Sequence, residues 1–583
     1  MLHTLTRSLR ENKGPALVTV LLSALEVVFE IVIPLFMSNL IDFGIEGGSM
    51  AAVWKFGAFL LLLAAFQLAT GVLAARIAAR ASVGFAANLR EDMYNNVQTF
   101  AFSNIDKFST ASIVTRLTTD TTNVQNAFQM LMRMAIRAPV MLVFSMIVSF
   151  RISRDISMTF LIILPILALA LFFIIRSVFP VFTRVFRTYD ELNNVVQENV
   201  RGIRVVKSFN QERHEIGKFG AISERIYKDF SKGERLITLN APLMQFCIYT
   251  CMIVISWLGA KAIIASGNDP ALGLTTGNLT ALITYTMQIL SSLMMLSMVF
   301  AMLTISLSSA RRIAEVLEER SDIPQPEQPV MTVRDGAVDF DHVSFVYASK
   351  ADKKVLDDID LHIRSGETIG IIGGTGASKS SLVQLIPRLY DVTGGKLTLG
   401  GVDVRDYDLD TLRGAVAMVL QKNEMFSGTI KENLRWGSEN ATDEELQHAC
   451  VLACADEFIS AMPDGYDTHI EQGGTNVSGG QKQRLCIARA LLKKPKVLIL
   501  DDSTSAVDTR TDAQIQQALS TYIPDTTKII IAQRISSVQN ADRIVVLDDG
   551  HIDAVGCHDE LLRTCEIYRE VYESQQKGGE DDA

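Results

Sequence analysis

Six long apolar stretches occupy the first half of this 583-residue chain. A helix needs about 20 mostly apolar residues to cross the hydrocarbon core of a bilayer, and each stretch is at least that long. A buried helix of a soluble protein can imitate one such stretch, but not six in succession. We therefore predict an all-α membrane domain over residues 1–320, with spans near 16–41, 53–78, 133–153, 157–178, 240–265 and 277–304.

The distribution of lysine and arginine predicts how these spans are oriented. Residues 1–320 hold 29 basic and 22 acidic side chains, whereas residues 321–583 hold 26 basic and 43 acidic ones. Basic residues precede the first span and fill two connections, one between spans two and three and one between spans four and five. Because basic loops stay in the cytoplasm, we place both termini there. We expect a multi-pass protein of a bacterial plasma membrane.

The two basic connections contain few proline or glycine breaks and carry apolar residues at helical spacing. We expect them to continue the membrane helices into the cytoplasm. Each is expected to turn around a short cross-helix, near Ile105–Ser112 and Gln211–Phe219. Ordinary cytoplasmic loops are the alternative.

The second half of the chain has the composition of a soluble domain. A proline-rich linker at 321–335 leads to an acidic domain at 336–575, and the polar tail 576–583 is expected to be disordered. A strand-like run at Thr368–Ile372 opens onto a glycine-rich loop and then a helical pattern. This order is typical of loops that bind nucleotide phosphates through backbone amides. The loop consists of Gly373, Gly374, Thr375, Gly376, Ala377, Ser378, Lys379, Ser380 and Ser381.

Two residue pairs predict the chemistry of this domain. Lys379 supplies a positive charge for the β- and γ-phosphates, and Ser380 offers a hydroxyl to Mg²⁺. A second strand-like run ends in Asp501 and Asp502, of which the first is suited to hold Mg²⁺ and the second to orient water. We therefore predict an α/β P-loop ATPase domain with ATP and Mg²⁺ as cofactors. No basic patch with interleaved aromatic residues argues for nucleic acid.

The run Ser478, Gly479, Gly480 and Gln481 lies between the two motifs, and the whole set resembles the ATP-binding cassette (ABC) family. Together with the six spans, nearly the full chain resembles an exporter-type half-transporter. The resemblance implies that two chains pair, with each ATP between the phosphate loop of one chain and the signature of the other, and that the cross-helices contact the ATPase domains. It also implies roles for Tyr347 (adenine stacking), Gln421 (Mg²⁺ and catalysis), Asp508 (the loop after the second acid) and Gln533 (the switch position).

Three positions depart from the family pattern. Ser378 stands where glycine usually precedes the lysine, Asp502 where active members have glutamate, and Gln533 where histidine is usual. A shorter carboxylate is displaced by about an ångström, which can cost on the order of 10²-fold in rate. The signature is intact. We infer a chain whose own site binds ATP but hydrolyses it slowly, while its signature completes the site of a different partner in a heterodimeric multidrug-type exporter.

The substrate is expected to be a small amphipathic molecule. Three alternatives stay open: a slow homodimeric exporter, an ATP-gated regulator or channel, and an exporter-fold importer of metal chelates or vitamins. Glu26 and Glu30 share one face of the first span, and ionisable groups inside a membrane often mark a pathway. They are candidates to meet a cationic substrate or a proton. The alternative is that they face a hydrated cavity or pair with a basic group on a neighbouring helix.

Overall fold

The computed structural model describes residues 1–269, 273–347, 354–374, 376–503 and 506–580. The chain divides into two compact units. The helical unit comprises Met1–Gln98 and Thr110–Glu319, and the sheet unit comprises Thr99–Ser109 and Arg320–Ala583. The segment Thr99–Ser109 thus belongs with the sheet unit, although the sequence places it inside a continuous domain 1–320.

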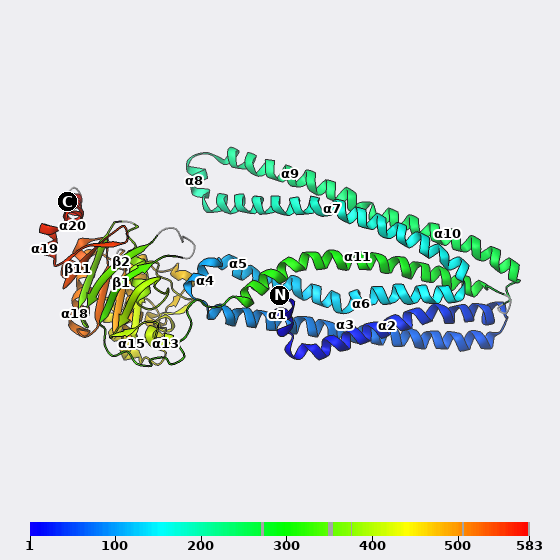
Figure 1. Cartoon of the computed structure of the whole chain (residues 1–583), viewed down its shortest axis with the longest axis horizontal. Coiled ribbons are helices and arrows are strands. Elements are labelled where there is room, and N and C mark those ends of the chain that lie inside the picture. The colour runs from blue at the N-terminus through cyan, green and yellow to red at the C-terminus, as the bar shows by residue number, and fades with distance from the viewer. Residues whose placement is uncertain (270–272, 348–353, 375, 504–505, 581–583) are drawn as a thin grey trace. The chain divides into compact units, whose positions relative to one another are not determined.

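Six helical runs of the described chain are long and apolar enough to cross a membrane, which confirms the six predicted spans. Several are more than twice the length that a bilayer requires, so they extend beyond it. The elements of the helical unit (Figure 1) are α1 (Leu2–Arg7), η1 (Arg10–Asn12), α2 (Lys13–Asn39), η2 (Leu40–Glu46), α3 (Met50–Gln98), α5 (Thr110–Thr115), η3 (Arg116–Asp120), α6 (Thr121–Ile152), α7 (Arg154–Arg201), α8 (Ile203–Ser208), α9 (Glu212–Thr238), α10 (Asn240–Ser266) and α11 (Thr276–Glu318).

The helical unit buries small residues and exposes large apolar ones. α2 packs along α3, and α6 packs along α11. Ala74, Ala78 and Ala81 of α3 are fully buried, because small side chains let neighbouring helices approach closely. Phe246 and Trp257 of α10 are exposed. Such side chains are stable in contact with lipid, which agrees with helices that cross a membrane.

α7 and α9 run antiparallel and pack on each other beyond the membrane spans (Figure 1). We call residues 179–238, which include the turn helix α8, the arm. Gly202 ends α7 and the chain turns through α8. The cross-helix predicted at Gln211–Phe219 is wrong in position, because Gln211 is already the N-cap of α9.

The other predicted cross-helix, near Ile105–Ser112, overlaps two short helices. α4 (Phe102–Lys107) ends at Phe108, whose backbone is extended, and α5 begins two residues later. The turn therefore lies at the centre of the predicted segment, but it separates two helices instead of forming one.

The sheet unit contains a four-stranded antiparallel sheet and a six-stranded, mainly parallel sheet (Figure 1). The first has the order β2 (Leu356–Ile363), β1 (Val338–Phe345), β4 (Gly394–Leu399), β5 (Val402–Asp403). The second has the order β12 (His551–Gly556), β11 (Arg543–Asp548), β3 (Thr368–Gly373), β10 (Thr527–Ile531), β9 (Val497–Asp501), β6 (Val416–Val419). A third, two-stranded sheet pairs β7 (Gly428–Thr429) with β8 (His469–Ile470).

Helices cover this sheet core and confirm the predicted α/β class. They are α12 (Lys379–Leu385), α13 (Leu409–Ala415), α14 (Ile430–Arg435), α15 (Asp443–Leu452), α16 (Asp456–Ser460), α17 (Gly479–Leu492), α18 (Thr509–Tyr522), α19 (His558–Thr564) and α20 (Glu566–Glu580). The described part of this unit also has three short 3₁₀ turns: η5 (Gly465–Asp467), η6 (Gln472–Gly474) and η7 (Ile535–Ser537).

The tail expected to be disordered, residues 576–583, is helical as far as Glu580. Residues 581–583 lie outside the described residues. α20 is anchored by Tyr568, which is fully buried in the core, and by Val571, which packs against it. Glutamine, lysine and glutamate are good helix formers, so the helix continues past its anchored turns.

Candidate nucleotide site

Four neighbouring strands of the six-stranded sheet run parallel, so their carboxyl ends meet at one edge. They are β3, β10, β9 and β6. Ligands of open α/β sheets bind at this edge. The phosphate loop follows β3, Gln533 follows β10, Asp502 follows β9 and Gln421 follows β6. The topology therefore gathers predicted site residues that are far apart in the chain.

The lysine of the phosphate loop bonds to the loop itself. Lys379 Nζ donates hydrogen bonds to the carbonyl oxygens of Gly373 and Gly374 at 2.8 and 2.9 Å. Burial lowers the pKa of Lys379, and the nearby carboxylates Asp501 and Asp502 oppose that shift. The ammonium is thus held at the loop by weak carbonyl acceptors, which a phosphate would replace with a stronger anionic one.

The glycines of the loop differ in how much space surrounds them. A Cβ on Gly374 or Gly376 would meet no atom within 4 Å, whereas a Cβ on Gly373 would meet the backbone oxygen of Leu547. The loop backbone is therefore open on one side, where a phosphate can approach its amides. Thr375 lies outside the described residues.

Ser378 adopts a backbone conformation that favours glycine. Its φ is +66° and its ψ is +20°, in the left-handed region, and it directly precedes α12. A side chain with a Cβ costs about 1–2 kcal/mol in this region. Ser378 therefore holds a backbone conformation that glycine would adopt without this cost.

Asp501 ends β9 and is almost completely buried. Burial raises the pKa of Asp501, and a hydrogen bond from Ser380 and the charge of Lys379 oppose this shift. Ser380 and Asp501, which are hydrogen-bonded to each other, offer oxygen donors of the type that Mg²⁺ prefers, and a role for Gln421 as a further ligand stays a prediction. These residues fit a Mg²⁺ ion held together with nucleotide phosphates.

The carboxylate of Asp502 is held by two amides. Its Oδ2 accepts hydrogen bonds from Gln533 Nε2 at 2.7 Å and from Gln421 Nε2 at 3.3 Å. Asp502 is buried and its φ is +47°. The three predicted catalytic residues thus form one network in which glutamine stands where the family has an ionisable histidine.

The signature residues form the N-terminus of α17. Ser478 Oγ accepts a hydrogen bond from the Gln481 amide at 3.3 Å, and the Gln481 side chain accepts one from the Ser478 amide at 2.9 Å. This reciprocal cap fixes the start of the helix, where the helix dipole attracts anions. A Cβ on Gly480 would lie 2.8 Å from the Ala506 carbonyl oxygen, whereas Gly479 has ordinary van der Waals space.

Two further predicted residues have clear structural partners. Asp508 caps α18 by accepting hydrogen bonds from the Thr511 amide at 3.0 Å and hydroxyl at 2.7 Å; these hydrogen bonds lower the pKa of Asp508. The Tyr347 hydroxyl lies 3.0 Å from Ser381 Oγ. Its ring stands edge-on to Tyr390 at 5.1 Å between centroids. Adenine stacking by Tyr347 stays a prediction.

Comparisons with known proteins match both units. Residues 16–294 match the family model described as "ABC transporter transmembrane region", and residues 356–505 match that described as "ABC transporter". The uncharacterized ABC transporter ATP-binding protein YfiB of Bacillus subtilis is 35% identical over 96% of each chain. This chain belongs to the ABC transporter family.

Two other comparisons agree with this assignment. An uncharacterized ABC transporter ATP-binding protein of Mycobacterium tuberculosis is 33% identical over 99% of this chain and 98% of its own. A solved structure of a bacterial Atm1-family ABC exporter with ATP bound has the same fold, with a TM-score of 0.82 over 97% of this chain and 99% of that one, at 23% identity.

The chain is therefore an ABC transporter with the fold of an ABC exporter. It is a multi-pass protein of a bacterial plasma membrane, joins a membrane domain to an ATP-hydrolysing ABC domain, and acts in a dimer, as half-transporters of this family do.

Both glutamates of the first span have a basic partner in this transporter. Arg137 of α6 donates to Glu26 at 2.7 Å and to Glu30 at 2.6 Å, both on α2. The sequence allowed such a pair but did not identify Arg137. The triad has one more acidic than basic side chain and joins two membrane helices.

α4 packs within the sheet unit through contacts that the sequence did not indicate. The Tyr390 hydroxyl donates to Asp106 at 2.8 Å, and the Phe102 ring packs edge-on against Tyr390. The Asn104 side chain donates to the Arg320 carbonyl oxygen at 2.9 Å. These contacts agree with the expectation that this cross-helix contacts the transporter's ATPase domain.

Proposed function

We propose that this chain is the slowly hydrolysing half of a heterodimeric exporter that moves a small amphipathic molecule out of the cell. The observation that supports this proposal is the Asp502 network, in which both neighbouring amides donate to one oxygen of a shortened carboxylate. A carboxylate that is displaced and already occupied is poorly placed to orient water for attack on a phosphate.

In this proposal, the chain's own site binds the nucleotide without turning it over quickly. Lys379 and the open loop amides hold the phosphates, while Ser380, Asp501 and Gln421 hold Mg²⁺. The ion neutralises phosphate charge when it is bound. Gln533 Nε2 has a second N–H that can donate a hydrogen bond to a γ-phosphate while the first stays on Asp502, but the amide carries no titratable nitrogen to stabilise charge.

The signature residues of the same chain are suited to complete the ATP site of a partner chain. The capped N-terminus of α17 presents backbone amides and the Ser478 hydroxyl to an anion. Full turnover then depends on a partner chain that brings glutamate and histidine at the two altered positions.

The arm supports a paired assembly. Beyond the membrane spans it exposes large apolar side chains that no described residue covers, among them Val200, Phe209 and Ile216. Apolar residues exposed outside the bilayer mark protein contacts. The Glu26–Arg137–Glu30 triad is the part of the membrane domain that we assign to the substrate pathway, with its excess of acidic over basic side chains suited to a cationic amphipath.

The test is the ATPase activity of the purified chain, measured alone and together with a co-encoded half-transporter. We expect slow turnover alone and fast turnover in the pair. Fast turnover by this chain alone would contradict the proposal, and equally slow turnover in the pair would favour a slow homodimer.

Asp502→Glu tests the chemical cause. We expect the variant chain alone to remain slow, because Gln533 and Ser378 are unchanged. The matched triple variant with Asp502→Glu, Gln533→His and Ser378→Gly should gain at least tenfold. Full activity of the single variant would show that carboxylate length alone limits the site.

A further inference from the structure

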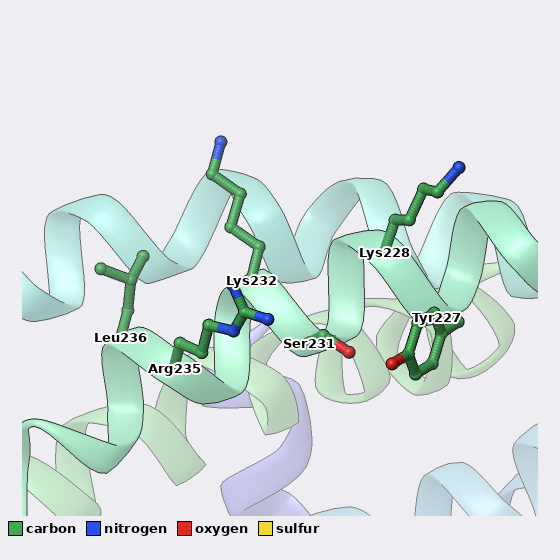
Figure 2. Close-up of a pocket in the computed structure, with 6 residues that line it drawn as sticks. All are labelled: Tyr227, Lys228, Ser231, Lys232, Arg235 and Leu236. Atoms are coloured by element: carbon green, nitrogen blue, oxygen red, sulfur yellow. The ribbon is translucent and has the colours of Figure 1, made fainter.

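The arm carries a basic groove near the membrane. The groove is formed on α9 and has a volume of about 540 Å³ (Figure 2). Its lining contains three cations at helical spacing and no acidic side chain. Figure 2 shows the two lysines pointing the same way, with the two hydroxyls facing each other. The lining residues are Tyr227, Lys228, Ser231, Lys232, Arg235 and Leu236.

Most of this positive charge is not neutralised by the protein. Lys228 forms a surface ion pair with Glu224 at 3.3 Å, which contributes little in water. Within the described part of the chain, no acidic side chain lies within ion-pair distance of Lys232 or Arg235. Such a concentration of unpaired cations attracts a polyanion or a phosphate.

The packing of α7 on α9 indicates how far the groove lies from the membrane spans. Arg184 of α7 pairs with Asp229 at 3.3 Å, and the Phe182 ring packs on Phe230 with a centroid distance of 5.6 Å. The predicted membrane span in α7 ends at residue 178. In this antiparallel register, residue 178 lies level with Arg235, near the C-terminal end of the groove.

The predicted membrane span in α10 gives a second measure of the distance between the groove and the hydrocarbon. It begins at Asn240, so Arg235 and Lys232 lie about 7 and 12 Å beyond it along the helix. A headgroup layer reaches about 5–8 Å beyond the hydrocarbon, so Arg235 is expected at its outer edge, and Lys232, further out, can extend its long side chain toward it.

The groove continues into an apolar surface. Leu236 closes its membrane end, and Leu239, Phe246 and Tyr249 are exposed beyond it on the same helical hairpin. We propose that the groove binds the phosphate headgroup of an anionic glycerophospholipid, whose acyl chains lie along α10. Arg235 suits bidentate contact with a phosphate and the lysines add point charges. The proposal does not depend on the hydrolysis rate or on the identity of the substrate.

The test is lipid binding by the full-length protein in detergent, followed by native mass spectrometry. Phosphatidylglycerol and phosphatidylcholine with the same acyl chains are titrated separately. Each basic residue near an anionic surface contributes about a fivefold factor, so K232Q/R235Q should weaken phosphatidylglycerol binding about 25-fold and leave phosphatidylcholine unchanged. The matched control K218Q/R225Q removes the same charge from α9 at about 33 and 22 Å beyond Asn240 and should bind as wild type.

The results that would overturn the proposal are distinct. Equal binding of the two lipids by wild type, or unchanged phosphatidylglycerol binding in K232Q/R235Q, would reject it. Equally tight binding of soluble glycerol phosphate would reject a lipid in favour of a free anion. A shift of oligomeric state in K232Q/R235Q, with lipid affinity retained, would assign the groove to a second chain. The four side chains changed in K232Q/R235Q and K218Q/R225Q are exposed. Size-exclusion chromatography and the thermal midpoint of unfolding check that each variant is folded.

Discussion

At the scale of single residues, Ser378 carries a side chain where the phosphate loop favours none. Its φ of +66° predicts that Ser378→Gly stabilises the protein by about 1 kcal/mol, or about 2–4 °C in thermal midpoint for a domain of this size. The control is Ser520→Gly on the exposed face of α18, where glycine should destabilise by about 0.5 kcal/mol. A decrease of the midpoint in both variants would show that the serine side chain makes a stabilising contact.

The carboxyl group of Asp501 predicts a pH dependence. Burial raises its pKa before Mg²⁺ binds, and Mg²⁺ coordination requires the ionised form. Binding therefore releases a proton, and Mg²⁺-dependent ATP affinity should rise with pH through that raised pKa and fall below it. Calorimetric titrations that start at the ordinary pKa of an aspartate and extend to neutral pH measure this slope. Asp501→Asn should lose the Mg²⁺ dependence and leave only the slope that ATP itself contributes.

At the scale of elements, Tyr390 makes two of the contacts that hold α4 in the sheet unit. Tyr390→Phe removes the hydrogen bond to Asp106 and keeps the ring contact with Phe102. A net contribution of about 1 kcal/mol predicts that amide exchange in residues 102–107 accelerates about fivefold. Exchange in α8 should stay unchanged. Equal acceleration in both helices would mean that the substitution acts on the whole chain.

α2 and α6 are joined by the Glu26–Arg137–Glu30 triad. Arg137→Met leaves two partly buried carboxylates without a cation, which should cost about 3–5 kcal/mol and lower the thermal midpoint in detergent. The triple variant Glu26→Gln, Glu30→Gln, Arg137→Met should recover most of that loss. A neutral effect of Arg137→Met would show that water already solvates both glutamates.

At the scale of the whole molecule, the arm exposes large apolar side chains that one chain leaves uncovered. Phe209, at its tip, is 70% exposed. Phe209→Ser should therefore leave ATP binding by this chain unchanged and lower partner-stimulated ATPase, because the apolar contact forms only in the assembly. Unchanged stimulation would place the partner contact elsewhere on the arm.

Much of this architecture was predictable because its causes are local. The length and polarity of a stretch decide whether it spans a bilayer, and the phosphate loop and the cap at Ser478 depend on residues a few positions apart. The position of the second cross-helix was not predictable at this level, because Gly202 ends α7 and the tertiary pairing of α7 with α9 decides where the turn falls.

The sequence by itself determined the six spans, the nucleotide-binding motifs and the three departures at Ser378, Asp502 and Gln533. Only the tertiary structure decided which groups meet: Arg137 with two glutamates of another helix, Tyr390 with α4, and Asp502 with amides from two neighbouring strands. These contacts join residues 31 to 284 positions apart. Hydrophobic length and backbone preference are properties of a segment, whereas pairing depends on which segments pack together.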